Sequence, residues 1–253
     1  DTSLANASLH ALLGPGDEIS PRAQQCNGTA EVLARVAADP RALGFVRFAD
    51  RRNARVLPVI DTPGDPVAPS VDAIRLESYP LTARLCLYVS PATAINPRSF
   101  IDFATGVNGQ NITAAHGYAD LSLRLSGRAA DRTAPADYIA ATKGAKRVMV
   151  SLRLRPGASE LDALAFDDIR RLKMFADITN ARELLVVGIC DRMGARETEI
   201  LASRTLAQKV KARLRETGIK AHSALGMGAI MPVADEKDDG GRNKNRRVEI
   251  WVR

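Results

Sequence analysis

Residues 183–194 read Glu-Leu-Leu-Val-Val-Gly-Ile-Cys-Asp-Arg-Met-Gly, and a long basic segment follows them. The apolar run at 184–187, closed by a glycine, predicts a short buried strand. Between residues 198 and 217 apolar side chains recur at helical spacing, and Gly218 ends that pattern. The sequence therefore predicts that Asp191 lies at the carboxyl end of a strand, beside a helix.

Further stretches of the C-terminal part accompany this strand, turn and helix. They are 151–162 (Ser-Leu-Arg-Leu-Arg-Pro-Gly-Ala-Ser-Glu-Leu-Asp), 224–228 (Ala-Leu-Gly-Met-Gly), 231–234 (Met-Pro-Val-Ala) and 241–252, which contains Asn-Arg-Arg-Val-Glu-Ile. Together they resemble the OmpA-like, peptidoglycan-binding domain family over roughly residues 147–253. The resemblance implies a mixed sheet with helices packed on it, and a periplasmic location at the cell wall or outer membrane.

The resemblance also implies a binding site. In that family the Asp of the strand-end turn pairs with the ammonium of a diaminopimelate side chain in the peptidoglycan stem, and an Arg on the following helix pairs with the carboxylate. Asp191 occupies the first position, but Leu206 occupies the second, and Glu199 replaces the family's helix Asn. Losing one charge-assisted contact costs about 1.5–3 kcal/mol, or roughly ten- to a hundredfold in affinity. We therefore expect weak binding of peptidoglycan.

Parts of this predicted site have more than one interpretation. Asp191 is also the type of residue whose oxygens accept backbone N–H bonds in a turn or at a helix start. Arg246 and Arg247 alternate faces in a predicted last strand, so one of them can point towards Asp191; the alternative is a solvated strand edge. Leu206 fits the apolar stripe of the helix and is expected to pack in the core. The expected peptidoglycan-binding residues are Asp191, Arg246 and Arg247.

The composition favours a soluble globular protein. The chain has 253 residues, of which 45% are hydrophobic and 26% charged, enough for one large or two ordinary domains. Its net charge is +7, yet only 4% of residues are aromatic and they are not interleaved with basic ones, which argues against nucleic-acid binding. No apolar run approaches the length of a membrane-spanning helix. The chain starts at Asp1 without a signal peptide, so we expect a processed or excised piece.

The N-terminal part is predicted to form a separate α/β unit. We expect helices at 29–38 and 98–105, and strands at 43–48, 54–60 and 85–89. The stretches 39–46 (Asp-Pro-Arg-Ala-Leu-Gly-Phe-Val) and 78–89 (Ser-Tyr-Pro-Leu-Thr-Ala-Arg-Leu-Cys-Leu-Tyr-Val) resemble the later part of a phosphate-type periplasmic substrate-binding protein. The resemblance implies an incomplete substrate-binding lobe, because most of one lobe of that family has no counterpart here.

This second resemblance implies an anion site of low affinity. The family's anion-binding motif lies at a helix start, and the corresponding place here is the beginning of the chain, where Thr2 and Ser3 supply hydroxyls. Half of a clamp cannot surround phosphate, so phosphate or another oxyanion is expected only as a ligand of a full-length parent. Frayed terminal residues are the alternative interpretation of Thr2 and Ser3.

The predicted order is therefore a partial substrate-binding domain at 1–125, a linker at 126–146 that is rich in small and charged residues, and an OmpA-like domain at 147–253. Cys26 and Cys86 are candidates for a disulfide in an oxidising compartment, and buried free thiols are the favoured alternative. The loop 235–241 (Asp-Glu-Lys-Asp-Asp-Gly-Gly) lacks the alternating ligands of a calcium loop, so we expect no metal there.

No sequence feature predicts catalysis. The chain has no nucleophile elbow, zinc-protease motif, P-loop or dinucleotide fingerprint, and its histidines are scattered, so we predict neither an enzyme nor a cofactor. The leading hypothesis is a non-catalytic cell-envelope module that binds peptidoglycan. The alternatives are an oxyanion-binding component of a transport system, and a scaffold whose OmpA-like site has lost its ligand.

Overall fold

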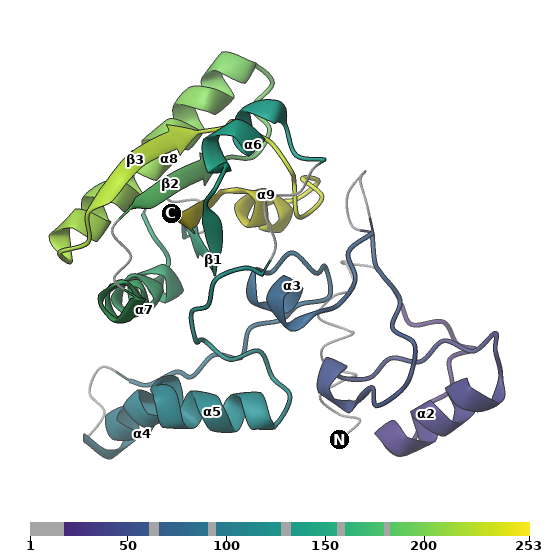
Figure 1. Cartoon of the computed structure of the whole chain (residues 1–253). Helices are drawn as coiled ribbons and strands as arrows, with labels where there is room; N and C mark the ends of the chain where they lie inside the picture. The colour runs from purple at the N-terminus through teal and green to yellow at the C-terminus, as the bar shows by residue number, and fades with distance from the viewer. Residues whose placement is uncertain (1–17, 61–65, 91–94, 128–132, 156–159, 180–182) are drawn as a thin grey trace. The chain divides into compact units, whose positions relative to one another are not determined.

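The computed structural model describes residues 18–60, 66–90, 95–127, 133–155, 160–179 and 183–253 (Figure 1). The described chain divides into two compact units. The first lies mainly within residues 18–120, and the second contains Leu121–Arg253 together with Asp72–Pro80. The second unit holds the sheet and all of the fully buried apolar side chains of the described residues.

A four-stranded mixed sheet forms the centre of the second unit (Figure 1). β2 runs parallel to β3 and antiparallel to β4, which is in turn antiparallel to β1. The predicted α/β class with a mixed sheet is confirmed, and the predicted strand at 184–187 lies within β2. The strands are β1 (Lys146–Arg153), β2 (Leu184–Ile189), β3 (Ala221–Gly226) and β4 (Arg247–Val252), in the spatial order β1-β4-β2-β3.

The interior position of β2 explains its sequence. All of its residues are buried, so it is a continuous apolar run rather than an alternating one. Successive side chains of a strand point to opposite faces. Val186 accordingly packs with Val148 and Ile250 in the core on one face, whereas Val187 packs with Trp251 in the core on the other. The sheet is therefore covered on both faces.

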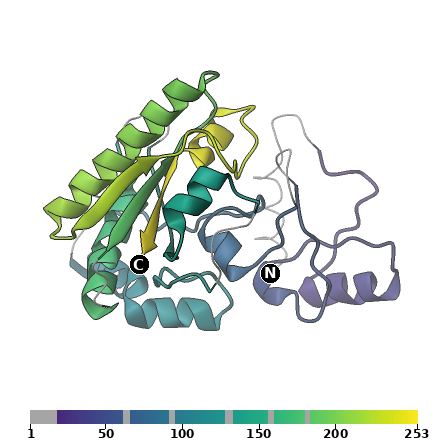
Figure 2. The ribbon, with the colours of Figure 1, turned by 45° about the horizontal axis from the view of Figure 1, so that its top comes forward.

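Helices from distant parts of the sequence supply the two covering layers. On one face, α7 (Ala163–Thr179) and α8 (Arg196–Glu216) contribute buried apolar residues to the core that contains Val186. On the other face, Tyr138 of α6 (Ala136–Thr142) packs edge-on against Trp251, with ring centroids 5.8 Å apart. Figure 2 shows α8 and α6 on opposite sides of the sheet. The predicted helix at 198–217 corresponds to α8, which confirms it.

Two glycines allow α8 to lie very close to the sheet. Gly188 of β2 and Gly226 of β3 are paired across the parallel ladder. A Cβ on Gly188 would clash with the carbonyl oxygen of Ser203, and a Cβ on Gly226 with the backbone of Arg204. The buried Ser203 hydroxyl also accepts a hydrogen bond from the backbone N–H of Gly228 at 2.8 Å. These contacts fix the first half of α8 beside the loop that follows β2.

The segment 126–146, predicted as a linker, has packed structure in its described residues. Leu125, just before it, forms a bridge with Val148 of β1. Tyr138 of α6 is 2% exposed, and Ala134 and Ala145 belong to the same buried cluster. The described part of the segment therefore lies inside the second unit. Its small and charged composition conceals this, because among the described residues of the segment Tyr138 is the one large apolar side chain that is buried.

The regular elements of the first unit, in its described residues, are helices. The predicted helix at 29–38 is confirmed as α2 (Thr29–Ala38), and the helix predicted at 98–105 lies within α4 (Ile95–Thr105). The strands predicted at 43–48, 54–60 and 85–89 are wrong, because the described structure has no strand over these three ranges. The further elements of the first unit are the 3-10 turn η1 (Phe48–Asp50) and α5 (Val107–Ala115); α3 (Val71–Arg75) belongs to the second unit from Asp72 onward.

The failed strand predictions have a physical explanation. An apolar strand is stabilised by paired neighbours and by burial of its side chains. Leu43 is 80% exposed, Leu85 is 72% exposed and Tyr88 is 90% exposed. Among the described residues of the first unit no apolar side chain is fully buried. The apolar runs therefore have no sheet into which to pair, although their composition is that of strands.

Among the described residues, no helix combines the length and the apolar character that crossing a membrane requires.

The close approach of α8 predicts a large effect of a single methyl group. Gly188→Ala should lower the free energy of unfolding of the second unit by about 1–3 kcal/mol, because the added Cβ overlaps the Ser203 carbonyl. Urea unfolding followed by the fluorescence of Trp251, the only tryptophan, measures this directly. Gly127→Ala is the matched control, since a Cβ there meets no atom within 4 Å. Equal stability of the two variants would contradict the close approach.

Candidate functional site

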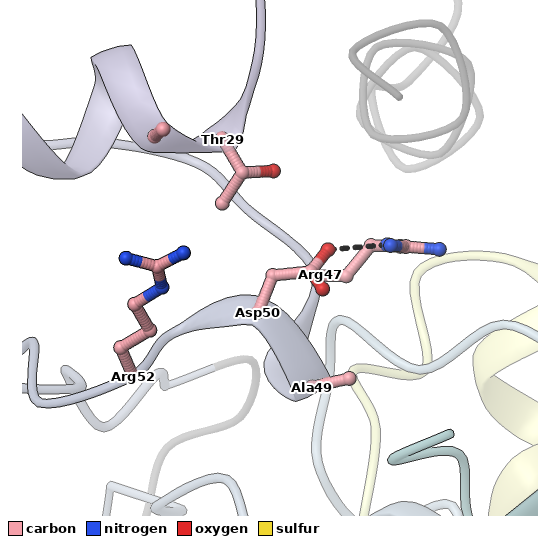
Figure 3. A pocket seen from close by; sticks show the side chains of 6 residues that line it. Thr29, Arg47, Ala49, Asp50 and Arg52 are labelled. Atoms are coloured by element: carbon pink, nitrogen blue, oxygen red, sulfur yellow. Dashed lines mark hydrogen bonds and ion pairs between the residues drawn. The ribbon is translucent and has the colours of Figure 1, made fainter.

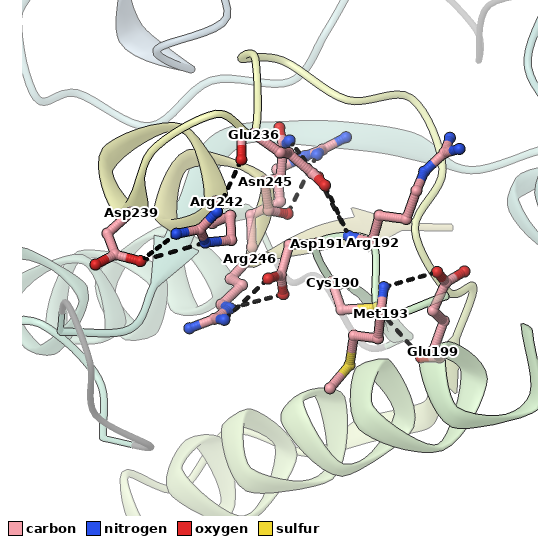
Figure 4. A network of polar contacts seen from close by, with 11 residues as sticks. Cys190, Asp191, Arg192, Met193, Glu199, Glu236, Asp239, Arg242, Asn245 and Arg246 are labelled. Atoms are coloured by element: carbon pink, nitrogen blue, oxygen red, sulfur yellow. Dashed lines mark hydrogen bonds and ion pairs between the residues drawn. The ribbon is translucent and has the colours of Figure 1, made fainter. Parts of the chain in front are cut away.

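A bidentate ion pair lies beside the carboxyl end of β2 (Figure 4). Asp191 follows β2, and Arg246 lies between α9 (Asp239–Asn245) and the start of β4. The Arg246 guanidinium donates from Nε to Oδ1 of Asp191 at 2.7 Å and from Nη2 to Oδ2 at 2.9 Å. The two residues meet because β2 and β4 are hydrogen-bonded neighbours, with Ile189 opposite Arg247. A pair of this geometry fixes the orientation of both side chains.

The two members of the pair differ in exposure. The side chain of Asp191 is 6% exposed, whereas that of Arg246 is 34% exposed. The hydrogen bond to Asp191 is the main reason why the pKa of Arg246 is raised above its ordinary value, so the guanidinium stays charged. The pair therefore presents a fixed positive group to solvent, with its carboxylate partner almost covered.

The loop after β2 is held by hydrogen bonds from its own backbone. Cys190 N donates to the Gly228 carbonyl at 3.1 Å, Arg192 N to Oε2 of Glu236 at 3.0 Å, and Met193 N to Oε1 of Glu199 at 2.9 Å. The alternative interpretation of Asp191 had its oxygens accepting backbone N–H groups. Among the described residues no such bond is found, and Arg246 binds both oxygens instead.

Asn245 fixes the residue that precedes Arg246. Its side chain is buried; Oδ1 accepts from Val233 N at 2.7 Å and Ala234 N at 3.1 Å, while Nδ2 donates to the Ala234 carbonyl at 2.9 Å and to Glu236 at 2.7 Å. Glu236 thus connects Asn245 to the loop that carries Asp191. Sequence reasoning did not assign these positioning roles. The signal for Asn245 was its place at the start of the Asn-Arg-Arg-Val-Glu-Ile stretch.

The predicted role of Arg247 needs a correction. Arg247 is 3% exposed, and its Nη2 donates to the Met231 carbonyl at 3.0 Å and its Nε to Glu249 at 3.1 Å. It therefore has no surface from which to reach a wall polymer. Arg246, which was predicted to belong to the last strand, instead ends α9, and this places its side chain on Asp191. Of the two arginines, only Arg246 remains a candidate contact.

Arg247 belongs to a buried charged cluster around Glu249. Glu249 is fully buried; it accepts a hydrogen bond from the Tyr138 hydroxyl at 2.6 Å and lies 3.1 Å from Nη1 of Arg147. Burial acts to raise the pKa of Glu249, but Arg147, Arg247 and the hydrogen bonds outweigh it and hold the pKa below its ordinary value. Burial, followed by the charge of Glu249, raises the pKa of Tyr138. Glu249 is therefore a charged structural group beneath α6.

Leu206 lies in the core, as the helical stripe predicts. Its side chain is 6% exposed and packs with Val210 and Leu214 of α8 in the core on that face. Glu199, on the first turn of the same helix, binds the Met193 N–H. The two positions at which the resemblance expects ligand-binding Arg and Asn therefore have structural contacts here.

Cys190 is a structural residue in this loop. Its thiol donates to the Glu199 carbonyl at 3.3 Å, and burial is the main reason why its pKa is raised to about 12. Cys26, Cys86 and Cys190 are all free, and only Cys190 is buried, because Cys86 is exposed and Cys26 is half-buried. In the loop 235–241, Asp238 caps α9 by accepting from Gly241 N at 2.7 Å. Among the described residues no cluster of His, Cys, Asp or Glu is arranged to hold a metal ion.

The predicted anion-binding residues are not among the residues that the structure describes. Thr2 and Ser3 are outside the described residues. The first unit does have a surface pocket of about 350 Å³ at the start of α2 (Figure 3). Arg47 in this pocket is already paired with Asp50 at 2.5 Å and donates to the Tyr118 hydroxyl at 2.9 Å. The side chain of Asp50 lines the pocket and is 25% exposed, so its carboxylate opposes an incoming anion; the other arginine of the lining is Arg52, which is exposed.

No protein-family model and no curated protein matches the chain. Among solved structures, it is similar to the peptidoglycan-associated lipoprotein of Burkholderia pseudomallei, at 19% identity over 41% of this chain and 89% of that one, with a TM-score of 0.36. The OmpA-like domain of FopA1 from Francisella tularensis has 18% identity, coverage of 44% and 74%, and a TM-score of 0.36. The cell wall anchor of the T6SS from Pseudomonas aeruginosa has 17% identity, coverage of 57% and 92%, and a TM-score of 0.32. At such low identities and TM-scores these similarities assign no role to the site, which depends on its own residues.

The burial of Leu206 predicts the outcome of introducing the arginine that the sequence resemblance would place at this position. Leu206→Arg should lower the free energy of unfolding by about 3 kcal/mol or more, because it places an unpaired charge in an apolar core. Urea unfolding monitored by Trp251 fluorescence is the measurement. Thr205→Arg, at the adjacent exposed position, is the matched control and should change stability by less than about 0.5 kcal/mol. A stable Leu206→Arg protein would show that position 206 can reach solvent.

The Glu249 cluster predicts a stability difference that depends on pH. Glu249→Gln should destabilise by about 3–5 kcal/mol at pH 7, because the buried Arg247 and the half-buried Arg147 remain without their carboxylate. The folded pKa of Glu249 lies below the ordinary value of 4.5, so its stabilisation is complete above that pH and is lost as the pH falls through the folded pKa. In unfolding curves measured from pH 7 to pH 3, the stability difference between the two proteins should therefore be constant near neutral pH and become smaller below pH 4.5.

The control for this cluster is Glu216→Gln, which removes an exposed carboxylate paired with Arg213 and should change stability by less than about 0.5 kcal/mol. A difference between wild type and Glu249→Gln that stays constant down to pH 3 would mean that folding leaves the pKa of Glu249 unchanged, and would contradict its stabilisation by the two arginines.

Proposed function

We propose that this chain is a non-catalytic cell-envelope protein whose second unit binds peptidoglycan at the Asp191–Arg246 pair. The observation that carries the proposal is the pair itself, a charged group fixed at the surface by a bidentate partner. Its location after β2 and beside α8 is the one that the sequence resemblance to OmpA-like domains implies for a ligand-binding carboxylate. The proposed location is the periplasm, in association with the cell wall or outer membrane, because that is where the ligand lies.

The charges around the pair suit a peptide ligand of the wall. Stem peptides carry carboxylates, and those that contain diaminopimelate also carry a side-chain ammonium. Arg246 is exposed enough to contact a ligand carboxylate, and the acidic residues Glu236 and Asp239 lie on the neighbouring loop and helix. The proposed affinity is low, because Leu206 and Glu199 are committed to contacts inside the protein and add no charged contact to a ligand.

The described residues favour no second function. An oxyanion-binding role would need cationic and N–H groups that converge on one site. In the pocket at α2, however, the carboxylate of Asp50 accepts a hydrogen bond from Arg47, the less exposed of its two arginines. A scaffold role, in which the second unit binds no wall polymer, is the outcome of the experiment below if binding is absent.

Retention of the purified chain by peptidoglycan sacculi tests the proposal. The wild-type chain should co-sediment with sacculi, and Asp191→Ala should reduce retention by roughly tenfold or more, because Arg246 loses the partner that holds it in place. Asp177→Ala, which removes an exposed carboxylate on α7, is the matched control and should bind like wild type. Absence of wild-type retention would overturn the proposed function. Equal retention of wild type and Asp191→Ala would show that Asp191 has no role in it.

A further inference from the structure

The hydrogen bonds of Arg246 leave one end of its guanidinium open. A guanidinium carries N–H donors on Nε, Nη1 and Nη2 in a planar fork. Arg246 uses Nε and one hydrogen of Nη2 for Asp191. Among the described residues no contact to Nη1 is found, and Figure 4 shows that the far end of the guanidinium points away from Asp191. The Nη1–Nη2 end is therefore a second fork that remains available.

The open fork determines which ligand group can bind. The carboxylate of Asp191 is the buried member of the pair, with 6% of its side chain exposed, so an incoming ammonium has little access to its oxygens. The exposed member is a cation, and a guanidinium end binds a carboxylate through two parallel N–H bonds. The accessible contact is thus complementary to an anionic, planar group.

We propose that Arg246 is the residue that recognises a carboxylate of the wall stem peptide, through its Nη1–Nη2 end, and that Asp191 is the positioning residue that holds it. This inference rests on the proposed function, and it adds which chemical group of the ligand, a carboxylate, the site binds. Arg246 would supply the carboxylate contact that Leu206, buried in the core, cannot make.

The surroundings narrow the ligand further. Asp239 contributes to the electrostatic environment of Arg246, and Glu236 lies on the loop that packs against Asn245. Asp239 is paired with Arg242 at 2.6 Å, and Glu236 accepts hydrogen bonds from Arg192 N and Asn245, so each presents only part of its charge to a ligand. Together they favour a ligand with an ammonium beside its carboxylate over one with several negative charges, such as a polyphosphate. A diaminopimelate side chain, which ends in both groups, fits this arrangement.

Two soluble tripeptide stems distinguish the bound group. One has free carboxylates on the stem and on its terminal diaminopimelate, and the other has all of these carboxylates amidated, while both keep the side-chain ammonium. Isothermal titration of the full chain should show the free acid binding about tenfold to a hundredfold more tightly than the amide, as one charge-assisted contact predicts. Equal affinities, or tighter binding of the amide, would overturn the inference.

Variants of the pair identify the residue responsible. Arg246→Gln should bind both stems equally and weakly, and Arg246→Lys should recover only part of the preference, because it restores the charge without the fork. Asp191→Asn should also reduce the preference, although Arg246 is still present. Arg192→Gln is the matched control, since it removes an exposed arginine from the same loop and should keep the full preference.

The opposite result has a clear meaning. If Arg246→Gln bound the stems more tightly than wild type, Arg246 would be competing with the ligand's ammonium for Asp191, and the inference would be wrong. Trp251 fluorescence during unfolding establishes that each variant is folded, and Arg246→Lys provides the test if Arg246→Gln is not. Sacculus binding by wild type without a preference between the stems would overturn this inference alone, whereas no sacculus binding would overturn the proposed function as well.

Discussion

The bidentate contact between Asp191 and Arg246 joins two parts of the chain that are far apart in sequence. It connects the loop after β2 to the residue between α9 and β4. The two interior strands of the sheet are thereby joined by side chains at the carboxyl end of β2. A buried carboxylate without a partner is costly, and an arginine without a carboxylate is free to move. The pair solves both problems and leaves one cationic end at the surface.

The scaffold beneath the pair depends on close packing at a few positions. Gly188 and Gly226 let α8 lie directly on β2 and β3, which fixes the loop that carries Asp191. On the opposite face, Glu249 pairs with the half-buried Arg147 and the buried Arg247 and binds the Tyr138 hydroxyl, which attaches α6 to the sheet. A carboxylate in the middle of a strand is thereby satisfied without contact to solvent. Charge and packing together hold the site rigid.

Much of the second unit could be predicted from local sequence, since the apolar run of β2 indicates a buried strand and the apolar stripe of α8 indicates a helix. The partner of Asp191 could not be chosen, because alternation along a strand left Arg246 and Arg247 equivalent until α9 was seen to include residues up to Asn245. Tyr138 was missed because a single aromatic residue in a small, charged segment gives no periodic signal. The apolar runs of the first unit predicted strands, but a strand exists only with neighbours, which composition cannot supply.

The central claim is that the surface end of Arg246 binds the ligand while its other edge stays on Asp191. A crystal structure of the chain with a diaminopimelate-containing stem peptide tests it most directly. The account predicts a ligand carboxylate within hydrogen-bond distance of Nη1 and Nη2 of Arg246, with the contact to Asp191 retained. A ligand ammonium on Asp191 with Arg246 turned away, or a ligand bound at another surface, would contradict it.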